Sequence, residues 1–537
     1  MSLPDFLIVG SGCTGAVAAQ TLAEAGYSVL IIDGGQHDEG AANKIPKDSF
    51  ISLRRNDNSQ EKYFLGENFE SIPEGKTSSG AQLTPARNFL TRETEKYLPL
   101  ISEQFSAIES LAVGGLGGGW GLGCCVFSEE ELRLCGLDAA QMKTAYQVIA
   151  DRMGLSGERD DATPYTSSTI SGIQPAFALD KQAARLKHNY ERKRSSLSEQ
   201  GFFLGRPALA LLTQDRGDRK GLKRRDMDFY DDFGNSAWRA WMLINELKKK
   251  PNVQHESGWL VTDFRETENE TVVNAIRVGT NEKKEFRARK LILAAGPLGT
   301  ARLVLRSVAG GRETKLPFIC NPYNYTPLLL PKLLGSEISE NHIGLAQLSL
   351  FHDEGKKGTD IAMASLYSYH ALMLFRLLRE TPLNFRDGRM AMRYLLPAIM
   401  IAGIHHPESR GENQFVHLDQ LDSSPTGDCL RVDYQLSQSK MDRVNEREKK
   451  YRSALKKLGA YALKQVRPAI GASVHYAGVL PFSNEATAFG LAADGRLHNH
   501  SRVFVADGSG FNFLPAKGLT LSLMANAHNV AQAAAGR

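Results

Sequence analysis

The chain begins with a glycine-rich turn set between a short apolar run and a stretch of small, helix-forming residues. Residues 6–9 (FLIV) lead into residues 10–15 (GSGCTG), which are followed by residues 16–25 (AVAAQTLAEA) and a second apolar run at 28–32 (SVLII). Short apolar runs of this kind are typical of buried parallel strands, and Gly26 stands where the intervening helix should stop. The pattern predicts a strand–helix–strand unit with a glycine turn at the start of its helix.

Each glycine of this turn has a physical reason. Gly10 permits the tight turn, Gly12 lets the backbone approach a pyrophosphate, and Gly15 lets helix and strand pack closely. The helix N-terminus adds amide donors and the positive end of its dipole. Asp33 follows Gly15 by 18 residues, at the end of the second strand, where a carboxylate can accept from ribose hydroxyls. The spacing favours a dinucleotide site over a purely structural turn and leaves FAD and NAD both open.

The same kind of strand recurs much later in the chain. Residues 290–295 (KLILAA) precede Gly296-Pro297 and a helical stretch, and residues 502–506 (RVFVA) precede Asp507-Gly508 and a final helix expected from about Thr520. Three separated segments of α/β character predict one parallel sheet interrupted by insertions. Between them, alternating segments such as 414–418 and 430–434 predict an antiparallel sheet in a second domain.

Composition narrows the class of protein. The chain has 537 residues, with 65 Lys and Arg against 60 Asp and Glu, so it can form several cores and is too balanced in charge to favour nucleic acid. Its six cysteines lack the spacing of a disulfide framework or a zinc site. The pair His405-His406 could suggest a metal ion, but neighbours on a strand point to opposite faces, so we expect none.

Two segments have more than one interpretation, and in each case one of the interpretations is a binding surface. Residues 181–225 hold 13 Lys and Arg against 4 Asp and Glu, which favours a solvated connector over a patch for acidic head groups or a phosphorylated substrate. Residues 371–404 are apolar with scattered arginines; core helices and strands are the first interpretation, and peripheral contact with a membrane or a bulky apolar substrate is the alternative. With no signal-like start and no apolar run of about 18 residues, we expect a cytoplasmic protein.

Four segments together resemble the glucose-methanol-choline (GMC) oxidoreductase family. They are residues 7–35 around the first turn, residues 111–123 (LAVGGLGGGWGLG), residues 288–307 (ARKLILAAGPLGTARLVLRS), and the C-terminal stretch 475–531 that begins HYAGVLPF. Their order along the chain carries the resemblance, whereas the region expected to bind substrate is similar only loosely.

The resemblance implies an α/β fold with a Rossmann-like FAD-binding domain, discontinuous in sequence, and a substrate domain built on an antiparallel sheet. The implied boundaries are 1–175, 246–315 and 470–537 for the FAD-binding domain, and 176–245 and 316–469 for the substrate-binding domain. Family members with covalent flavin attach it through a histidine near the second motif, and residues 111–123 contain none, so dissociable FAD is expected.

The resemblance also implies the residues around the cofactor. They are Gly10, Gly12, Cys13, Thr14, Gly15, Asp33, Gly114, Gly115, Gly118, Trp120, Gly121, Val261, Ala295, Gly296, Asp507, Gly508, Gly518, Leu519 and Thr520. The helix from Thr520 would point its N-terminus at the flavin and stabilise negative charge on the reduced ring.

Oxidation of an alcohol needs a base for the hydroxyl proton and an acceptor for the hydride. His475 matches the histidine of the family's C-terminal motif and is the candidate base, with a structural histidine as the alternative. The family's second His or Asn corresponds to Gly518, which has no side chain. Lys517 and Asn512 are the candidates to fill that gap.

The sequence therefore predicts an FAD-dependent oxidoreductase acting on a CH–OH group of a small molecule, with a carbohydrate, glycoside or natural-product intermediate as the expected substrate. Oxygen, a quinone or a protein remain open as the electron acceptor. One alternative is a redox-neutral flavoenzyme such as a mutase or isomerase, which the glycine at 518 would fit. Another is a non-catalytic nucleotide-binding protein that uses the basic segment, including Arg224 and Arg225, for interaction.

Overall fold

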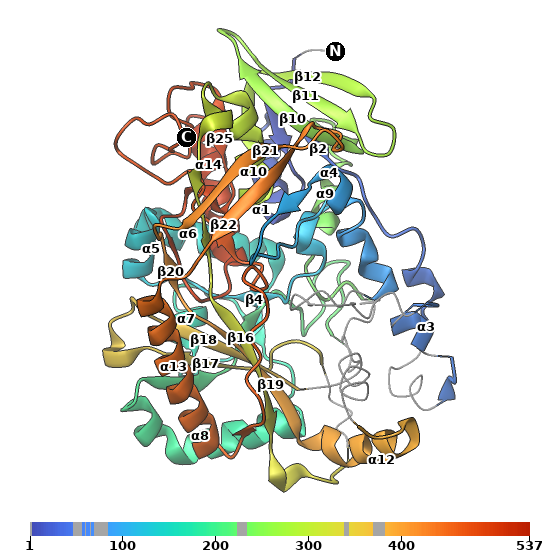
Figure 1. Ribbon diagram of the computed structural model, residues 1–537, viewed down its shortest axis with the longest axis vertical. Helices are drawn as coiled ribbons and strands as arrows, with labels where there is room; N and C mark the ends of the chain where they lie inside the picture. Colours follow the sequence, from blue (N-terminus) through green and yellow to red (C-terminus); the bar gives the residue numbers. More distant parts are fainter. Residues whose placement is uncertain are drawn as a thin grey trace.

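The fold is known from a computed structural model, which describes residues 3–46, 56–59, 61–64, 66–68, 84–222, 234–337, 343–368 and 382–537. Arg224 and Arg225, and residues 371–381 of the apolar stretch, lie outside these ranges. Two sheets dominate the molecule, a parallel one in the upper half of Figure 1 and an antiparallel one in the lower half.

The parallel sheet joins strands from distant parts of the chain. Its order is β25 (Val503–Val505), β13 (Lys290–Leu293), β1 (Phe6–Val9), β2 (Val29–Asp33) and β9 (Val253–Ser257), and all four pairings are parallel. The predicted strand–helix–strand unit is present as β1, α1 (Cys13–Glu24) and β2. The discontinuous sheet predicted from the three apolar runs is thus confirmed.

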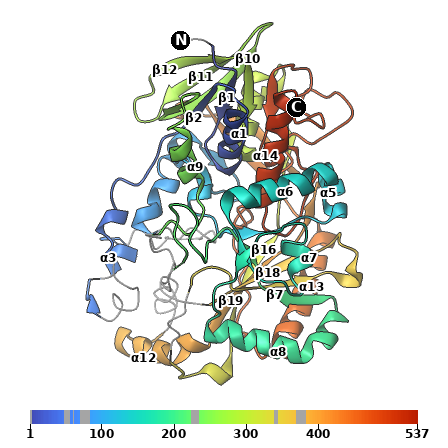
Figure 2. The ribbon, with the colours of Figure 1, turned by 180° about the vertical axis from the view of Figure 1, so that it is seen from behind.

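Both faces of this sheet are covered, which is why its strands are continuously apolar. On one face α1 packs against α14 (Thr520–Ala534), which in turn packs against α6 (Ala139–Met153), as Figure 2 shows. On the other face lie α10 (Gly296–Ser307) and an antiparallel sheet of β10 (Trp259–Glu266), β11 (Thr271–Arg277) and β12 (Lys283–Ala288). The alternate side chains of β1 separate accordingly, since Phe6 and Ile8 belong to the first core and Leu7 and Val9 to the second.

The second large sheet is antiparallel, with six strands. Its order is β23 (Tyr461–Ala462), β16 (Tyr323–Leu329), β19 (Ile399–His405), β18 (Ala362–Ser368), β17 (Leu348–His352) and β7 (Phe202–Gly205). Even-numbered side chains of these strands form a core with α8 (Lys181–Ser198) and α13 (Gln438–Lys457). The odd-numbered side chains face the opposite way, toward the inside of the molecule.

The strands predicted at 414–418 and 430–434 exist as a hairpin, β21 (Gln414–Gln420) and β22 (Asp428–Tyr434). The hairpin forms a sheet with β14 (Leu316–Pro317) and β3 (Leu100–Ile101) and packs on α10, sharing a core with the parallel sheet. The predicted boundaries place it instead in the substrate domain.

Shorter elements connect these layers. They are η1 (Ala42–Lys44), α3 (Glu61–Phe64), η2 (Pro85–Leu90), α4 (Thr94–Tyr97), η3 (Gly115–Gly118), β4 (Gly123–Cys124), α5 (Glu129–Cys135), β5 (Ser156–Gly157), α7 (Thr163–Thr166), β6 (Gln174–Pro175), β8 (Ala208–Leu209), α9 (Ala240–Leu247), η4 (Gly311–Glu313), β15 (Ile319–Cys320), η5 (Pro331–Leu333), η6 (Glu354–Lys356), α12 (Phe385–Leu395), η7 (Leu396–Ala398), β20 (Glu408–Ser409), β24 (Tyr476–Ala477), η8 (Gly508–Gly510) and β26 (Phe513–Leu514). No helix in the described ranges combines the length and apolar character needed to cross a bilayer.

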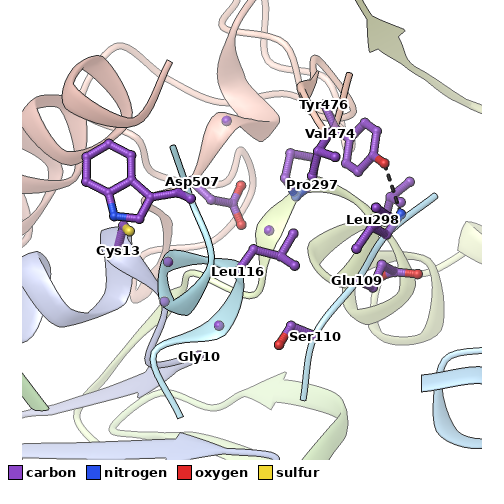
Figure 3. Close-up of a pocket in the computed structure, with 18 of the residues that line it drawn as sticks. Gly10, Cys13, Glu109, Ser110, Leu116, Pro297, Leu298, Val474, Tyr476 and Asp507 are labelled. Carbon is purple, nitrogen blue, oxygen red and sulfur yellow. Dashed lines mark hydrogen bonds between the residues drawn. The ribbon is translucent and has the colours of Figure 1, made fainter. Parts of the chain in front are cut away.

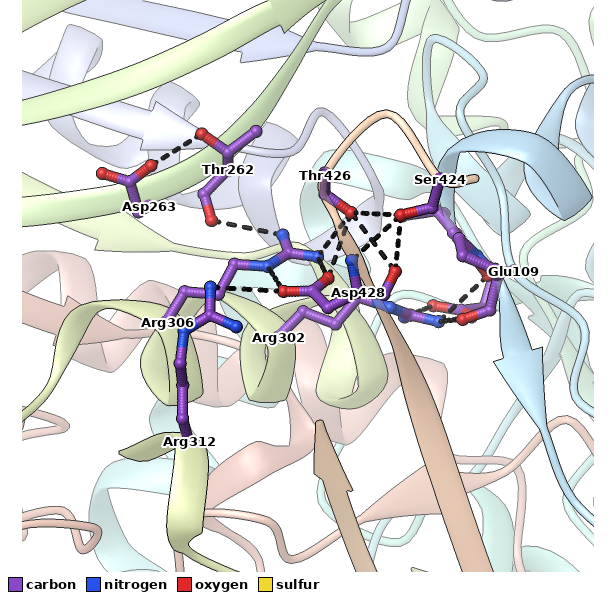
Figure 4. Close-up of polar contacts among 11 residues, drawn as sticks. Glu109, Thr262, Asp263, Arg302, Arg306, Arg312, Ser424, Thr426 and Asp428 are labelled. Carbon is purple, nitrogen blue, oxygen red and sulfur yellow. Dashed lines mark hydrogen bonds and ion pairs between the residues drawn. The ribbon is translucent and has the colours of Figure 1, made fainter. Parts of the chain in front are cut away.

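Two arginines one turn apart on α10 tie it to its surroundings (Figure 4). The Arg302 guanidinium donates to both carboxylate oxygens of Glu109, at 2.7 and 3.0 Å. Arg306 donates to Asp428 Oδ2 from Nε at 3.0 Å and to Oδ1 from Nη2 at 2.5 Å, and Arg312 approaches the same carboxylate at 3.6 Å. The Asp428 side chain is 0% exposed, so its charge depends on these partners rather than on water.

We expect Asp428→Asn to destabilise the protein by about 3–5 kcal/mol, because it leaves the Arg306 charge buried without a counter-charge. Chemical denaturation followed by tryptophan fluorescence measures the effect. Asp419→Asn is the matched control, because Asp419 lies on the same hairpin and its partner Arg431 is exposed to solvent. Equal shifts of the denaturation midpoint in the two variants would contradict the assignment of Asp428 as the link between α10 and the hairpin.

Candidate active site

A cavity of about 1110 Å³ lies between the two sheets. It extends from the turn after β1 to the inward face of the six-stranded sheet, so one space joins residues of both halves. Figure 3 shows Gly10 and Cys13 of the first turn, Leu116 of the second glycine-rich segment, and Asp507 and Pro297 facing this space.

Most residues predicted around the cofactor do line the cavity, as does His475. Those that line it are Gly10, Gly12, Cys13, Thr14, Asp33, Gly115, Trp120, Gly121, Val261, Ala295, Gly296, His475, Asp507, Gly508, Gly518, Leu519 and Thr520. Gly15, Gly114, Gly118, Asn512 and Lys517 are not among its lining residues.

The three glycines of the first turn meet different surroundings. A side chain at Gly10 would place Cβ 2.5 Å from the carbonyl oxygen of Ala294, and the backbone there has φ +100°. A Cβ at Gly15 would lie 1.9 Å from the carbonyl oxygen of Gly10. A Cβ at Gly12 would meet nothing within 4 Å, because that direction opens into the cavity. Gly10 and Gly15 are therefore needed by the fold, whereas Gly12 leaves space for a ligand.

Three helix N-termini converge on the cavity. The helices α1, α10 and α14 begin after Gly12, Ala295 and Leu519, and none of them has a side-chain cap or an acidic residue in its first turn. By contrast, α6, α8 and α13 are capped by Asp138, Asp180 and Ser437. 

Uncapped first turns leave backbone N–H groups without an intrahelical partner, at the positive end of the helix dipole. The residues at all three starts line the same cavity, so the amides of α1 and α14 can donate to one ligand, whereas the Gly296 amide of α10 already donates to the buried carboxylate of Asp507. A ligand with phosphate groups and a second site of negative charge fits this arrangement.

The Asp33 carboxylate accepts four hydrogen bonds from other residues of the protein. Its carboxylate accepts from Ser11 Oγ and His255 Nε2 at one oxygen, the latter at 2.8 Å, and from Ser257 Oγ and Gly35 N at the other, both at 3.1 Å. Ser11 Oγ in turn accepts from the amide of Gly114 at 2.9 Å. Four donors already fill the carboxylate's acceptor positions. Asp33 thus ties β2 and β9 to the two glycine-rich segments, and its contact with a ribose hydroxyl stays a prediction.

The second glycine-rich segment approaches the cavity through only part of its length. Gly115, Trp120 and Gly121 line it, whereas a Cβ at Gly114 would lie 2.6 Å from the Trp241 amide nitrogen and one at Gly118 would lie 2.7 Å from a Leu90 methyl carbon. Gly114 and Gly118 therefore allow the segment to pack against its neighbours. Neither of them lines the cavity.

His475 has a defined tautomer because Asn321 fixes its orientation. The Asn321 amide nitrogen donates to the carbonyls of His406 and Leu514, at 2.8 and 3.1 Å, so its Oδ1 is the atom 2.9 Å from His475 Nδ1. Oδ1 can only accept, so the proton resides on Nδ1 and Nε2 keeps its lone pair. Burial lowers the pKa of His475 to about 4, which keeps the ring neutral at neutral pH.

The backbone beside His475 is strained. Val474 has φ +58°, a left-handed conformation that is an outlier for a β-branched residue, and it also lines the cavity. Such strain persists where the surroundings over-determine the backbone, and it is concentrated at functional sites. It supports the interpretation of His475 as a functional rather than a purely structural histidine.

A second histidine, His405, was missed as a site residue in the sequence. Its ring stacks on His475 with centroids 4.7 Å apart and 24° between planes, and it lines the cavity. Burial, with smaller contributions from His475 and His406, holds its pKa well below the usual value. His406 points the other way, 3.8 Å from Glu448, as expected for neighbours at the end of a strand. The described residues contain no cluster of three or more His, Cys, Asp or Glu placed to hold a metal ion.

Lys517 and Asn512 do not fill the gap at Gly518. The Lys517 ammonium lies 2.7 Å from Glu131, both side chains being 0% exposed, and it donates to the Val126 carbonyl at 3.1 Å. The Asn512 amide donates to the Phe482 carbonyl at 3.0 Å, away from the cavity. A Cβ at Gly518 would lie 2.7 Å from the Gly123 carbonyl oxygen, so this position has no room for a side chain.

Comparison with known proteins confirms the fold class. Residues 8–49 match the family described as NAD(P)-binding Rossmann-like domain. No curated protein sequence matches the chain. The structure is similar to pyridoxine 4-oxidase from Mesorbium loti, with a TM-score of 0.58, 14% identity and 99% of each chain covered. It is also similar to an arginine-to-alanine variant of formate oxidase from Aspergillus oryzae RIB40, studied for FAD modification, with a TM-score of 0.58, 12% identity, and 99% of this chain and 98% of that chain covered. At these identities the likeness shows the fold.

We expect His475 to remain neutral and protonated at Nδ1 from about pH 5.5 to 8, because its pKa is about 4. Nitrogen NMR of histidine-labelled protein reports both the tautomer and the pKa, and Asn321→Ala should remove the tautomer preference. The unfolded pKa is about 6.5, so the stability contributed by the neutral ring is present above pH 6.5 and is lost as the pH falls toward 4. Titration near pH 6.5, or a proton on Nε2, would contradict this description of the site.

Proposed function

We propose that this protein is a GMC-type flavoenzyme that binds FAD non-covalently and oxidises a CH–OH group of a small molecule. The observation that carries the proposal is the continuity of the cavity, which joins three uncapped helix N-termini to a neutral histidine with an available Nε2. The fold shared with two oxidases supports it, one of which is described with FAD. A carbohydrate, glycoside or natural-product intermediate remains our proposed substrate.

The residues around the cavity fit FAD. The α1 amides beside Gly12 would hold the pyrophosphate, Val261 would flank the adenine, and the α14 start at Thr520 would face the negative edge of the flavin ring. Residues 1–175, 246–315 and 470–537 remain the proposed FAD-binding domain, and 176–245 and 316–469 the proposed substrate-binding domain.

The chemistry that FAD supplies when bound is acceptance of a hydride at N5. His475 Nε2 takes the hydroxyl proton of the substrate, while its Nδ1–H stays bonded to Asn321 and prevents the ring from rotating. Loss of one proton and one hydride from the CH–OH group yields a carbonyl.

His405 is our candidate for the second polar group of the site, in place of a side chain at position 518. It approaches from the substrate sheet rather than from the segment before α14, and it stacks on the ring of His475. With this group present, the glycine at 518 no longer favours a redox-neutral reaction. The interaction role of Arg224 and Arg225 falls outside the described residues and carries no proposal.

We expect Gly12→Ala to weaken FAD binding at least about tenfold while the apoprotein keeps its melting temperature. The added methyl group points into the cavity and meets no protein atom, so it obstructs only the ligand. Titration of apoprotein with FAD, followed by quenching of flavin fluorescence, measures the affinity. Gly15→Ala is the contrasting variant, because its Cβ collides with the Gly10 carbonyl and should prevent folding. If Gly12→Ala binds FAD as tightly as the wild type, the first glycine-rich turn does not contact FAD.

We expect His475→Ala to lower the rate of anaerobic flavin bleaching by an alcohol about 10²–10⁴-fold, since the hydroxyl proton then has no positioned base. The visible spectrum of the bound flavin should remain that of the wild type. His188→Ala, on the exposed face of α8, is the control and should bleach at the wild-type rate. A His475→Ala rate within about threefold of wild type would exclude His475 as the base. Subsequent addition of air or a quinone identifies the electron acceptor.

A further inference from the structure

The inward face of the six-stranded sheet forms one wall of the cavity. The alternation along its strands directs six side chains into this space, namely Tyr323, Ser349, Met363, Ser365, Tyr367 and His405. Cross-strand pairing makes them a continuous surface, since Ser349 pairs with Ser365 and Met363 pairs with His405. We call these six residues the sheet wall.

Charged side chains line the cavity only in its other half, among the described residues. They are Asp33, Glu93, Glu95, Lys96, Glu109, Arg302, Arg306 and Asp507. Several of them are engaged by the protein, as Arg302 is by Glu109, and Asp507 accepts from Thr300 Oγ1 at 2.6 Å. The sheet wall and His475 therefore offer no charge of either sign to a ligand.

The two histidines do not change this conclusion at neutral pH. Burial lowers the pKa of His475 to about 4 and holds that of His405 well below its usual value, so both rings are uncharged. An ionic group placed against this surface would lose its hydration without gaining a counter-charge, which is strongly unfavourable.

The sheet wall also contains a hydroxyl group without a partner. Ser349 is 0% exposed, and its Oγ makes no hydrogen bond in the described structure. A buried hydroxyl left unpaired is destabilising, by roughly 1–3 kcal/mol, so a ligand atom that bonds to it is favoured. Ser349 pairs with Ser365, and Ser365 pairs with Gly403, which is two residues before His405 on β19. On ideal strand spacings this places the Cα atoms of Ser349 and His405 roughly 12 Å apart.

We infer that the substrate is an uncharged, ring-containing alcohol with a second oxygen function on the side of the molecule away from the reacting carbon. The reacting CH–OH group lies at His475, the body packs against the tyrosine and histidine rings, and the second oxygen bonds to Ser349. The inference rests on the proposed oxidation at His475, and it adds the charge and the size of the compound.

The test is calorimetric binding to the FAD-loaded protein with four aryl alcohols of similar size. They are 4-methoxybenzyl alcohol, benzyl alcohol, the anion 4-(hydroxymethyl)benzoate and the cation 4-(aminomethyl)benzyl alcohol. We expect both neutral compounds to bind at least about tenfold more tightly than either ion, because only the ions must give up hydration without compensation. Equal or tighter binding of the anion or the cation would overturn the inference.

Ser349→Ala tests the second contact. We expect this substitution to weaken the binding of 4-methoxybenzyl alcohol about fivefold more than the binding of benzyl alcohol. Only the methoxy compound has an oxygen that can reach the Ser349 hydroxyl. Ser368→Ala is the matched control, because Ser368 is also buried and unpaired but lies on the opposite face of the same sheet and does not line the cavity. If Ser349→Ala weakens the binding of both alcohols equally, Ser349 does not contact the substrate.

Binding needs no redox step, so the two proposals can fail separately. If neutral alcohols bind selectively but none bleaches the flavin under anaerobic conditions, the charge selectivity stands and the proposed oxidation is wrong. If a charged alcohol both binds best and bleaches the flavin, the oxidation stands and the inference about the substrate is wrong.

Discussion

The convergence of three uncapped helix N-termini on one cavity is the constraint on which the rest of the structure depends. Backbone amides in the first turns of these helices have no intrahelical partner; at α10 the Gly296 amide donates to the Asp507 carboxylate, whereas α1 and α14 have neither a side-chain cap nor an acidic residue in the first turn. The parallel sheet brings the first two starts together, because α1 follows β1 directly and α10 follows β13. The helix α14 joins them by packing on α1, although the two are separated by almost the whole chain.

The glycines follow from this arrangement. A helix that begins immediately after a buried strand leaves little room at the turn, and Gly10 and Gly15 meet backbone atoms that any side chain would strike. Gly12 differs, because its missing side chain leaves ligand space rather than packing space. Arg302 and Arg306 fix α10, the helix that presents one of the three starts, through their ion pairs with Glu109 and Asp428.

The other half of the cavity has the opposite electrostatic character. There the antiparallel sheet supplies hydroxyls, aromatic rings and His405, and the segment before β24 supplies His475, so this end of the cavity carries no charge at neutral pH. At the uncharged end, the Asn321 amide is fixed so that its Oδ1 accepts the proton of His475 Nδ1. Nε2 of His475 therefore keeps a lone pair that can accept a proton. A dinucleotide at one end and a neutral substrate at the other would meet beside this histidine.

The sequence predicted those strands, turns and helices whose pattern lies within a short stretch of consecutive residues. Strand β1, the glycine turn, α1 and β2 are encoded within about thirty consecutive residues, and the later strands of the same sheet repeat their apolar runs. Contacts between distant side chains could not be predicted in this way. The four donors to Asp33 come from three different segments, and the pairing of Lys517 with Glu131 depends on a helix almost 400 residues away. The stack of His405 on His475 likewise exists only after two sheets have packed, although the parity of a strand ending at His405 indicates which way it points.

The measurement that tests the account most directly is the visible absorption spectrum of the purified protein, before and after heat denaturation and centrifugation. We expect a flavin spectrum that moves into the supernatant, where the released compound is identified as FAD. A protein that is colourless and cannot be reconstituted with FAD would contradict the central claim that the three helix N-termini hold this cofactor. Colour that stays with the pellet would contradict non-covalent binding.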